Sequence, residues 1–233
     1  MKRVEQRDFE ALDYGKQTKA KLTAKQYLVY SYLMSISKWD SQDRESHYYV
    51  YKNSFVVNSA CKLLGMTAPT WRAAIKKLTE EGYIYQFDKY YIIDIPNSYA
   101  PLHINLIKTL VQFGSQIRNG GHIVSVYSVL YKFWKYQIDN GVQCVITITQ
   151  LRKLFGRGSH GETESFIYKL MLGVFQFLGI LDVEVVKREY KGNEYNAYII
   201  KNVELELAFE ENSEEIEPND ISEILEALNN SIK

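Results

Sequence analysis

Basic and hydroxyl side chains gather along one face of a helical pattern in residues 67–80. Apolar residues recur there at i, i+3, i+4 and i+7, which predicts a helix with one buried face. These apolar residues are Trp71, Ala74, Ile75 and Leu78. The opposite face carries Thr70, Arg72, Ala73, Lys76 and Lys77. Long cations beside small side chains can donate hydrogen bonds to phosphate oxygens and guanine edges. The alternative is an ordinary solvated helix face.

The segment before this helix has a second copy in the chain. Residues 55–65 resemble residues 146–156, which begin 91 positions later. Each copy contains a β-prone stretch, a polar N-cap candidate, a short apolar and basic helix and a terminating glycine. Each is followed by a longer amphipathic helix and a Tyr-, Ile- and Val-rich pair of strands. The duplication predicts two similar units, each ordered strand, helix, turn, helix and hairpin.

In the first unit, Thr23 and Gln26 fit a capping box that begins a helix over residues 24–38. We expect this helix to bury a single apolar stripe that includes Leu33 and Ile36. The polar residues 39–52 predict a loop or insertion.

A strand is expected next, over residues 55–57. Asn58 or Ser59 is the expected N-cap of the short helix, and Gly65 the left-handed residue that ends it. Thr67, as N-cap of the longer helix, is a further candidate contact. Lys89 is another, at the tip of a hairpin formed by residues 83–87 and 90–95.

The second unit is expected after a helix over residues 102–118 and a break at residues 119–121. Its first helix is marked by Val126, Leu130, Phe133, Trp134 and Gln137. A strand over residues 143–148 follows, and Thr149 is the expected cap of a helix over residues 150–155. The next helix is expected to bury Phe166, Leu170, Val174 and Phe177.

Two parts of the second unit could contact an anion. In the turn 156–162, Ser159 and Glu162 form a capping-box pattern, and amides at a helix N-terminus bind phosphate. Nucleotide binding is disfavoured because no GxxxxGK[ST] pattern is present. The other part is a hairpin tip over residues 187–194, with an expected turn at Gly192-Asn193; a solvated tip is the alternative. The candidate contacts are Arg157, Ser159, His160, Lys169, Lys187, Arg188, Lys191 and Asn193.

Charge is distributed unevenly although the formal net charge is zero. Residues 1–96 carry 15 Lys/Arg and 11 Asp/Glu, and residues 97–203 carry 12 and 7. Residues 204–233 carry 1 and 10, so an acidic tail follows a basic body. The end of the tail has an amphipathic pattern that suits a partner's groove, through Ile221, Ile224, Leu225 and Leu228. The alternative is a helix that packs on its own body or frays.

Patterns typical of enzymes and cofactor sites are not found. The four histidines, His47, His103, His122 and His160, lack metal-ligand spacing, and no GxSxG or HExxH motif occurs. We therefore expect no catalytic residue, cofactor or metal. The two distant cysteines indicate a reduced compartment, and no signal peptide or 18-residue apolar run is present. We expect a soluble, cytoplasmic protein without a membrane partner.

The chain also contains 19 tyrosines. They could provide platforms on which bases stack. The alternative is codon bias, because Lys, Asn, Ile and Tyr all have A/T-rich codons.

The order of these elements resembles the winged helix-turn-helix superfamily, over residues 22–96 and 122–202. The segment Glu80-Glu81-Gly82-Tyr83-Ile84 is similar to the step from the third helix into the wing in that superfamily. In size and in its opening Leu-Thr-Ala-Lys-Gln helix the chain resembles plasmid replication initiators and phage replisome organisers of low-GC bacteria. Residues 39–52 and the long turn 156–162 depart from the pattern.

The resemblance implies an α+β, predominantly α protein with two winged helices joined by a helix. The expected divisions are an arm (1–21), winged helix 1 (22–100), a connecting helix (101–121), winged helix 2 (122–203) and the tail (204–233). The implied function is binding of double-stranded DNA at a replication origin and recruitment of a replication protein through the tail. A transcriptional regulator, and a protein-binding tandem winged helix of the chromosome-condensation type, are the alternatives. The oligomeric state stays open, a homodimer included.

Overall fold

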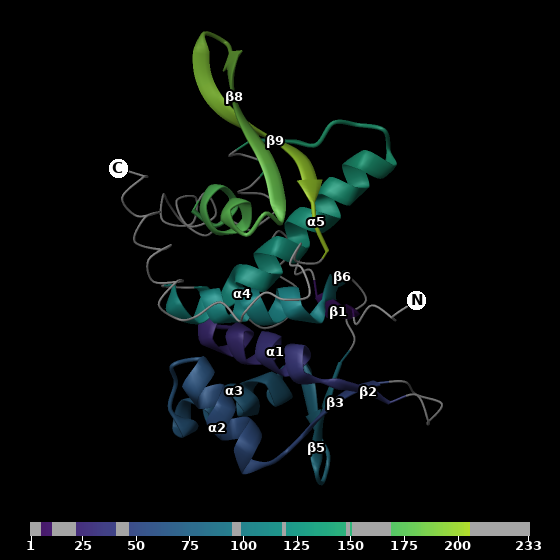
Figure 1. Cartoon of the computed structure of the whole chain (residues 1–233), viewed down its shortest axis with the longest axis vertical. Coiled ribbons are helices and arrows are strands. Elements are labelled where there is room, and N and C mark those ends of the chain that lie inside the picture. The colour runs from purple at the N-terminus through teal and green to yellow at the C-terminus, as the bar shows by residue number, and fades with distance from the viewer. Residues whose placement is uncertain are drawn as a thin grey trace. The chain divides into compact units, whose positions relative to one another are not determined.

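The computed structural model describes residues 6–10, 22–40, 47–94, 99–117, 120–147, 150 and 169–205. It is a mixed α+β structure, as the sequence predicted (Figure 1). The described residues separate into two compact units, with the boundary between Ser125 and Val126.

The first unit is built around a central helix, α1 (Ala24–Ile36). The capping box is confirmed: the Thr23 N–H donates to Gln26 Oε1 at 2.7 Å, and the Gln26 N–H donates to Thr23 Oγ1 at 3.4 Å. The other described helices are α2 (Ser54–Leu63), α3 (Ala68–Glu80), α4 (Ile104–Gln116) and the 3₁₀ helix η1 (Gly120–His122). In Figure 1, α1 lies between α4 on one side and α2 and α3 on the other. Residues 27–35 are therefore all buried, and the prediction of a single apolar stripe is wrong for this helix.

Two sheets complete the first unit. The strands of the first sheet, β1 (Gln6–Glu10) and β6 (Tyr99–His103), pair antiparallel. The second sheet has the order β2-β3-β5-β4 and is antiparallel throughout. Its strands are β2 (Lys38–Asp40), β3 (His47–Tyr51), β4 (Ile84–Gln86) and β5 (Tyr90–Ile93). The β4–β5 hairpin thus pairs with the strand that precedes α2.

The strand predicted over residues 55–57 is wrong, because these residues form the first turn of α2. The N-cap is Asn53 rather than Asn58 or Ser59; its side chain accepts a hydrogen bond from the Val56 N–H at 2.8 Å. This local cap outweighs the β-propensity of Phe-Val-Val. The strand in this part of the chain is β3, which lies earlier, in the region predicted as a loop. Its tyrosine and valine side chains point alternately to the two faces of the sheet. The two copies of the repeat therefore differ at their start.

The helix predicted over residues 102–118 begins two residues later, at Ile104. Leu102 and His103 belong to β6 instead. The His103 ring accepts a hydrogen bond from the Asn105 N–H at 3.2 Å and caps the helix.

Glycines allow α1, α4 and η1 to pack closely. A Cβ on Gly121 would lie 1.7 Å from the carbonyl oxygen of Ala24, at the start of α1. A Cβ on Gly120 would lie 2.3 Å from the carbonyl oxygen of Gly114 in α4. The glycines predicted only to interrupt a helix therefore form a backbone-to-backbone contact that no larger residue can make.

The ring of His122 lies 4.8 Å from that of Tyr27, centroid to centroid, and desolvation lowers the pKa of His122 to about 4. The unfolded chain, with an ordinary pKa of about 6.5, takes up the proton first as the pH falls. His122 therefore favours folding above about pH 6.5, and this contribution to the free energy of unfolding is lost as the pH falls from about 6.5 to 4. The total loss is at most about 3 kcal/mol.

The expected result is a fall in the free energy of unfolding between pH 7 and pH 4.5 that is smaller in His122→Gln. Urea denaturation of both proteins at both pH values measures the two falls. Carboxylates contribute equally to the fall in each protein, so the difference between the falls reports on His122. Equal falls in the two proteins would show that His122 is not desolvated in the fold.

The second unit contains most of α5 (Ile123–Asp139), the strand β7 (Val145–Thr147), the π-helix η2 (Lys169–Phe175) and the hairpin β8 (Leu181–Tyr190) and β9 (Asn193–Val203). The sheet order is β7-β9-β8. Tyr127 of α5 donates a hydrogen bond to the Ile180 carbonyl at 2.8 Å and also contacts the Glu204 carbonyl. Its ring packs edge-on against Phe175 at 4.9 Å, and burial raises the pKa of Tyr127. This residue ties the helix to both ends of the hairpin.

The prediction that Phe177 is buried is wrong, since its side chain is 56% exposed. Leu170 and Val174 are buried as predicted, together with Met171, Phe175 and Leu178. These positions repeat every four residues rather than every 3.6, because the segment up to Phe175 is a π-helix with a wider turn. A seven-residue spacing consequently no longer returns to the same face.

Candidate nucleic-acid interface

The turn between α2 and α3 is the local structure that the sequence predicted. Gly65 has φ +56°, and the Met66 N–H donates to the Cys61 carbonyl at 3.1 Å, which closes the end of α2. Thr67 caps α3, and its side chain accepts from the Thr70 N–H at 3.4 Å. Two helices joined by a short, fixed turn follow from these caps.

The two faces of α3 are also as predicted. Trp71, Ala74, Ile75 and Leu78 are buried, and Trp71 packs edge-on against Tyr32 of α1 with 6.1 Å between ring centroids. Arg72, Ala73 and Lys76 are exposed, while Thr70 and Lys77 are half-buried. α3 is thus held through its apolar face, and a short basic face is left open.

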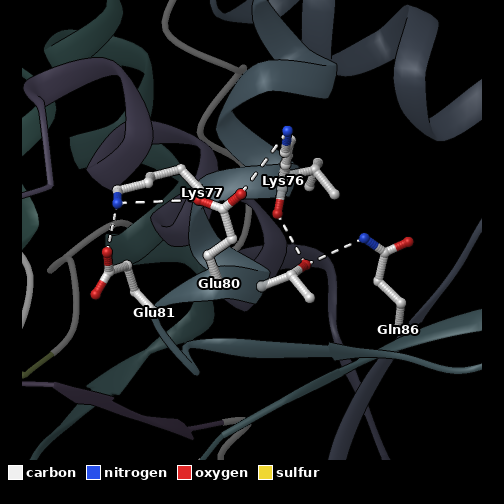
Figure 2. A network of polar contacts seen from close by, with 7 residues as sticks. Lys76, Lys77, Glu80, Glu81 and Gln86 are labelled. Carbon is white, nitrogen blue, oxygen red and sulfur yellow. Dashed lines mark hydrogen bonds and ion pairs between the residues drawn. The ribbon is translucent and has the colours of Figure 1, made fainter.

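Ion pairs compensate only part of the positive charge on that basic face. Lys77 forms a short contact with Glu81 and a longer one, at 3.9 Å, with Glu80 (Figure 2). Its hydrogen bond to Glu81 is the main cause that raises the pKa of Lys77. Lys76 reaches Glu80 only at 3.9 Å and has a side chain 79% exposed. Arg72 forms no ion pair among the described residues, so the uncompensated positive charge lies toward the N-terminal half of α3.

The β4–β5 hairpin is attached to α3 through a polar contact. The Gln86 side chain donates to Thr79 Oγ1 at 3.1 Å, and Thr79 in turn donates to the Ile75 carbonyl at 2.9 Å (Figure 2). Lys89 lies exposed at the two-residue turn, which is closed by reciprocal backbone hydrogen bonds between Phe87 and Tyr90. Lys89 is therefore a cation at the tip of a hairpin whose base is anchored to α3.

The second-unit candidates that the structure describes lie at the tip of the β8–β9 hairpin. The turn residues are Lys191 (φ +52°) and Gly192 (φ +75°), so the turn predicted at Gly192-Asn193 is one residue too late. Lys187 pairs with Glu194 at 3.3 Å. Arg188 is exposed and has no ion-pair partner in the described part of the chain.

Two further contacts hold the tip. The Lys191 ammonium lies 5.3 Å from the centre of the Tyr190 ring, and the Asn193 side chain donates to the Lys191 carbonyl at 3.4 Å. Lys187 and Lys191 at this tip are thus already in contact with other side chains. These candidates belong to a different unit from those on α3.

Several predicted site residues lie outside the described residues. These are Arg157, Ser159, His160, Ile221, Ile224, Leu225 and Leu228, as well as the side chain of Lys169 and the cap residue Thr149. A reciprocal capping pair is found nearby instead: the Thr147 N–H donates to Gln150 Oε1 at 2.8 Å, and the Gln150 N–H donates to Thr147 Oγ1 at 3.3 Å.

Two surface features were missed from the sequence. Lys62 is exposed in the last turn of α2, immediately before the turn into α3. Exposed rings also gather on one face of the β2-β3-β5-β4 sheet, among them Tyr51, Tyr85 and Phe87. The alternation of tyrosines in residues 47–51 and 83–91 is the signal that could have identified this face.

Within the described ranges, no group of three or more His, Cys, Asp or Glu side chains could hold a metal ion. No helix in those ranges is long and apolar enough to cross a bilayer. Burial raises the pKa of the Cys144 thiol to about 12, which keeps it protonated and unreactive.

In comparisons with protein-family models, curated protein sequences and solved structures, no match to this chain was found. Function must therefore be inferred from the chain's own geometry.

Proposed function

We propose that this chain binds double-stranded DNA through a winged helix in its first unit, with α3 as the helix that enters the major groove. The support is the element order, in which α1, β3, α2, α3 and the β4–β5 hairpin follow one another and β3 pairs with β5. In the second unit α5, β7, η2 and the β8–β9 hairpin follow the same order as far as the residues are described. This supports the proposal of tandem winged helices.

The observation that carries the proposal is the positive charge that α3 exposes, which is unpaired among the described residues at Arg72 and only weakly paired at Lys76. Arg72 and Lys76 project from a helix whose opposite face is buried, with only Ala73 between them on the exposed surface. A small residue lets a helix approach the groove, and the positive end of the helix dipole lies at the same end as Arg72. Because Lys77 is bound to Glu81, Arg72 is the better candidate for a base contact.

The biological role that we propose is replication initiation at a plasmid or phage origin, with the acidic tail recruiting a replication protein. This role rests on the resemblance and on the tail's charge. A transcriptional regulator would use the same contacts on α3.

Arg72→Ala is expected to lower affinity for the specific duplex by roughly 5- to 150-fold, because one bidentate base contact is worth about 1–3 kcal/mol. Fluorescence anisotropy with a labelled duplex from upstream of the coding sequence, and with a random duplex, measures the loss and the expected relaxation of specificity. Lys108→Ala is the matched control, since Lys108 is exposed on α4 in the same unit. If both variants bind the duplex like the wild type while folded, α3 is not the reading helix.

A further inference from the structure

The outer face of the β2-β3-β5-β4 sheet is lined with aromatic rings. Paired residues on neighbouring strands point to the same face, and Tyr48, Val50, Ile84 and Ile93 are buried on the inner face. The outer face therefore carries the row Lys38, Tyr49, Ile92 and Tyr85, and a second row in which Tyr51 lies opposite Tyr90. Phe87 extends the second row and stacks on Tyr90 at 5.6 Å, with 14° between the ring planes.

These rings are exposed although they contact one another. Tyr51 is 49% exposed, Tyr85 52% and Phe87 58%. Tyr51 packs edge-on against Tyr49 at 5.4 Å and against Tyr90 at 6.5 Å, so the neighbouring rings hold each other in place. Fixed rings lose little conformational entropy when a ligand stacks on them.

The inner side of the sheet is the side of the helices. Gln86, which alternates with Tyr85, points inward to Thr79 of α3. The aromatic face is consequently on the other side of the sheet from α3, and a ligand bound there would use none of the contacts proposed on α3. Of the proposed duplex contacts, Lys89 at the hairpin tip borders both surfaces.

Cations flank this face. Lys38 lies on it directly opposite Tyr49, and Lys89 stands at the hairpin tip beside Tyr90; neither has an ion-pair partner among the residues described. The described acidic side chains at its margins are Asp88, in the turn, and Asp94, after β5, both exposed.

We propose that this face binds single-stranded nucleic acid, with the exposed rings stacking on unpaired bases and the flanking lysines contacting phosphates. Aromatic platforms bordered by cations bind single strands without strict sequence preference. A protein partner is less well matched, because protein interfaces are depleted in lysine, and Lys38 and Lys89 border this face. This activity is separate from duplex binding by α3.

The test is fluorescence anisotropy with a labelled oligo(dT) of about 16 nucleotides, a length that matches the site sizes of known single-strand binders. Phe87→Ala is expected to lower affinity for this strand by roughly 5- to 150-fold, the loss typical of one stacked base, while Phe87→Tyr keeps the ring and the affinity. Phe55→Ala is the matched control, because Phe55 is 77% exposed but lies on α2. The duplex affinity of Phe87→Ala is expected to equal that of the wild type.

Two results would overturn the proposal. The first is equal oligo(dT) affinity in the wild type and a folded Phe87→Ala variant. The second is the absence of oligo(dT) binding by the wild type. If sedimentation then shows that copies of the chain associate through Phe87, the face is a protein interface and the proposal is overturned as well. Binding of oligo(dT) without any binding of duplex would contradict the duplex proposal alone.

Discussion

Raising the salt concentration from 50 to 200 mM is expected to weaken binding to duplex DNA by on the order of 10³- to 10⁵-fold. This range follows if the two units together neutralise about 6–10 phosphates, because each neutralised phosphate releases condensed counterions. Exposed cations that have no close ion pair among the described residues, such as Arg72, Lys89 and Arg188, would supply part of this number. Anisotropy titrations at four or five salt concentrations give the slope of log affinity against log salt.

The random duplex is the control for this titration, since phosphate contacts do not depend on sequence and its slope should be similar. A slope near zero, or no binding at low salt, would instead favour the protein-binding alternative, in which the basic surfaces are incidental.

Gly121→Ala is expected to destabilise the first unit by more than about 3 kcal/mol, a large part of the stability of a typical domain. The new methyl carbon would lie 1.7 Å from the Ala24 carbonyl oxygen, so η1 and the start of α1 must move apart. Loss of this contact would also disturb the support of α3, because α3 packs on α1. Urea denaturation followed by circular dichroism measures the change.

Gly65→Ala is the control that separates the cost of a steric clash from the cost of backbone strain. Gly65 has φ +56°, and apart from its two chain neighbours no described residue has an atom within 4 Å of the place that the added methyl group would take. Only about 1–2 kcal/mol of backbone strain is therefore expected there. A Gly121→Ala variant no less stable than Gly65→Ala would contradict the close approach of η1 to α1.

The features that the sequence predicted correctly depend on neighbouring residues. The Thr23–Gln26 capping box, the left-handed Gly65 and the buried face of α3 around Trp71 each need only a few positions within one or two turns of chain. Caps and periodicity carry such information directly. The candidate face of α3 could therefore be placed before the structure was known.

The features that it missed depend on contacts between distant segments, on a change of helix type, or on a local side-chain contact that competes with the pattern. Gly121 is fitted to Ala24, which is nearly a hundred positions away, and this contact cannot be read from local pattern. Phe177 is exposed because a π-helix shifts the phase of its segment. The outward-facing Lys77 predicted from spacing turns toward Glu81, since side-chain pairing was not part of the periodicity argument.

The most direct test of duplex binding by α3 is to follow backbone amide resonances of the folded chain while unlabelled duplex is added. The predicted result is that the largest saturable shifts fall on residues 67–77 and on Lys89, with small changes at the buried Leu78 and Ile84. Saturable duplex binding that leaves the amides of residues 67–77 unmoved would contradict the assignment of α3 as the DNA-contacting helix.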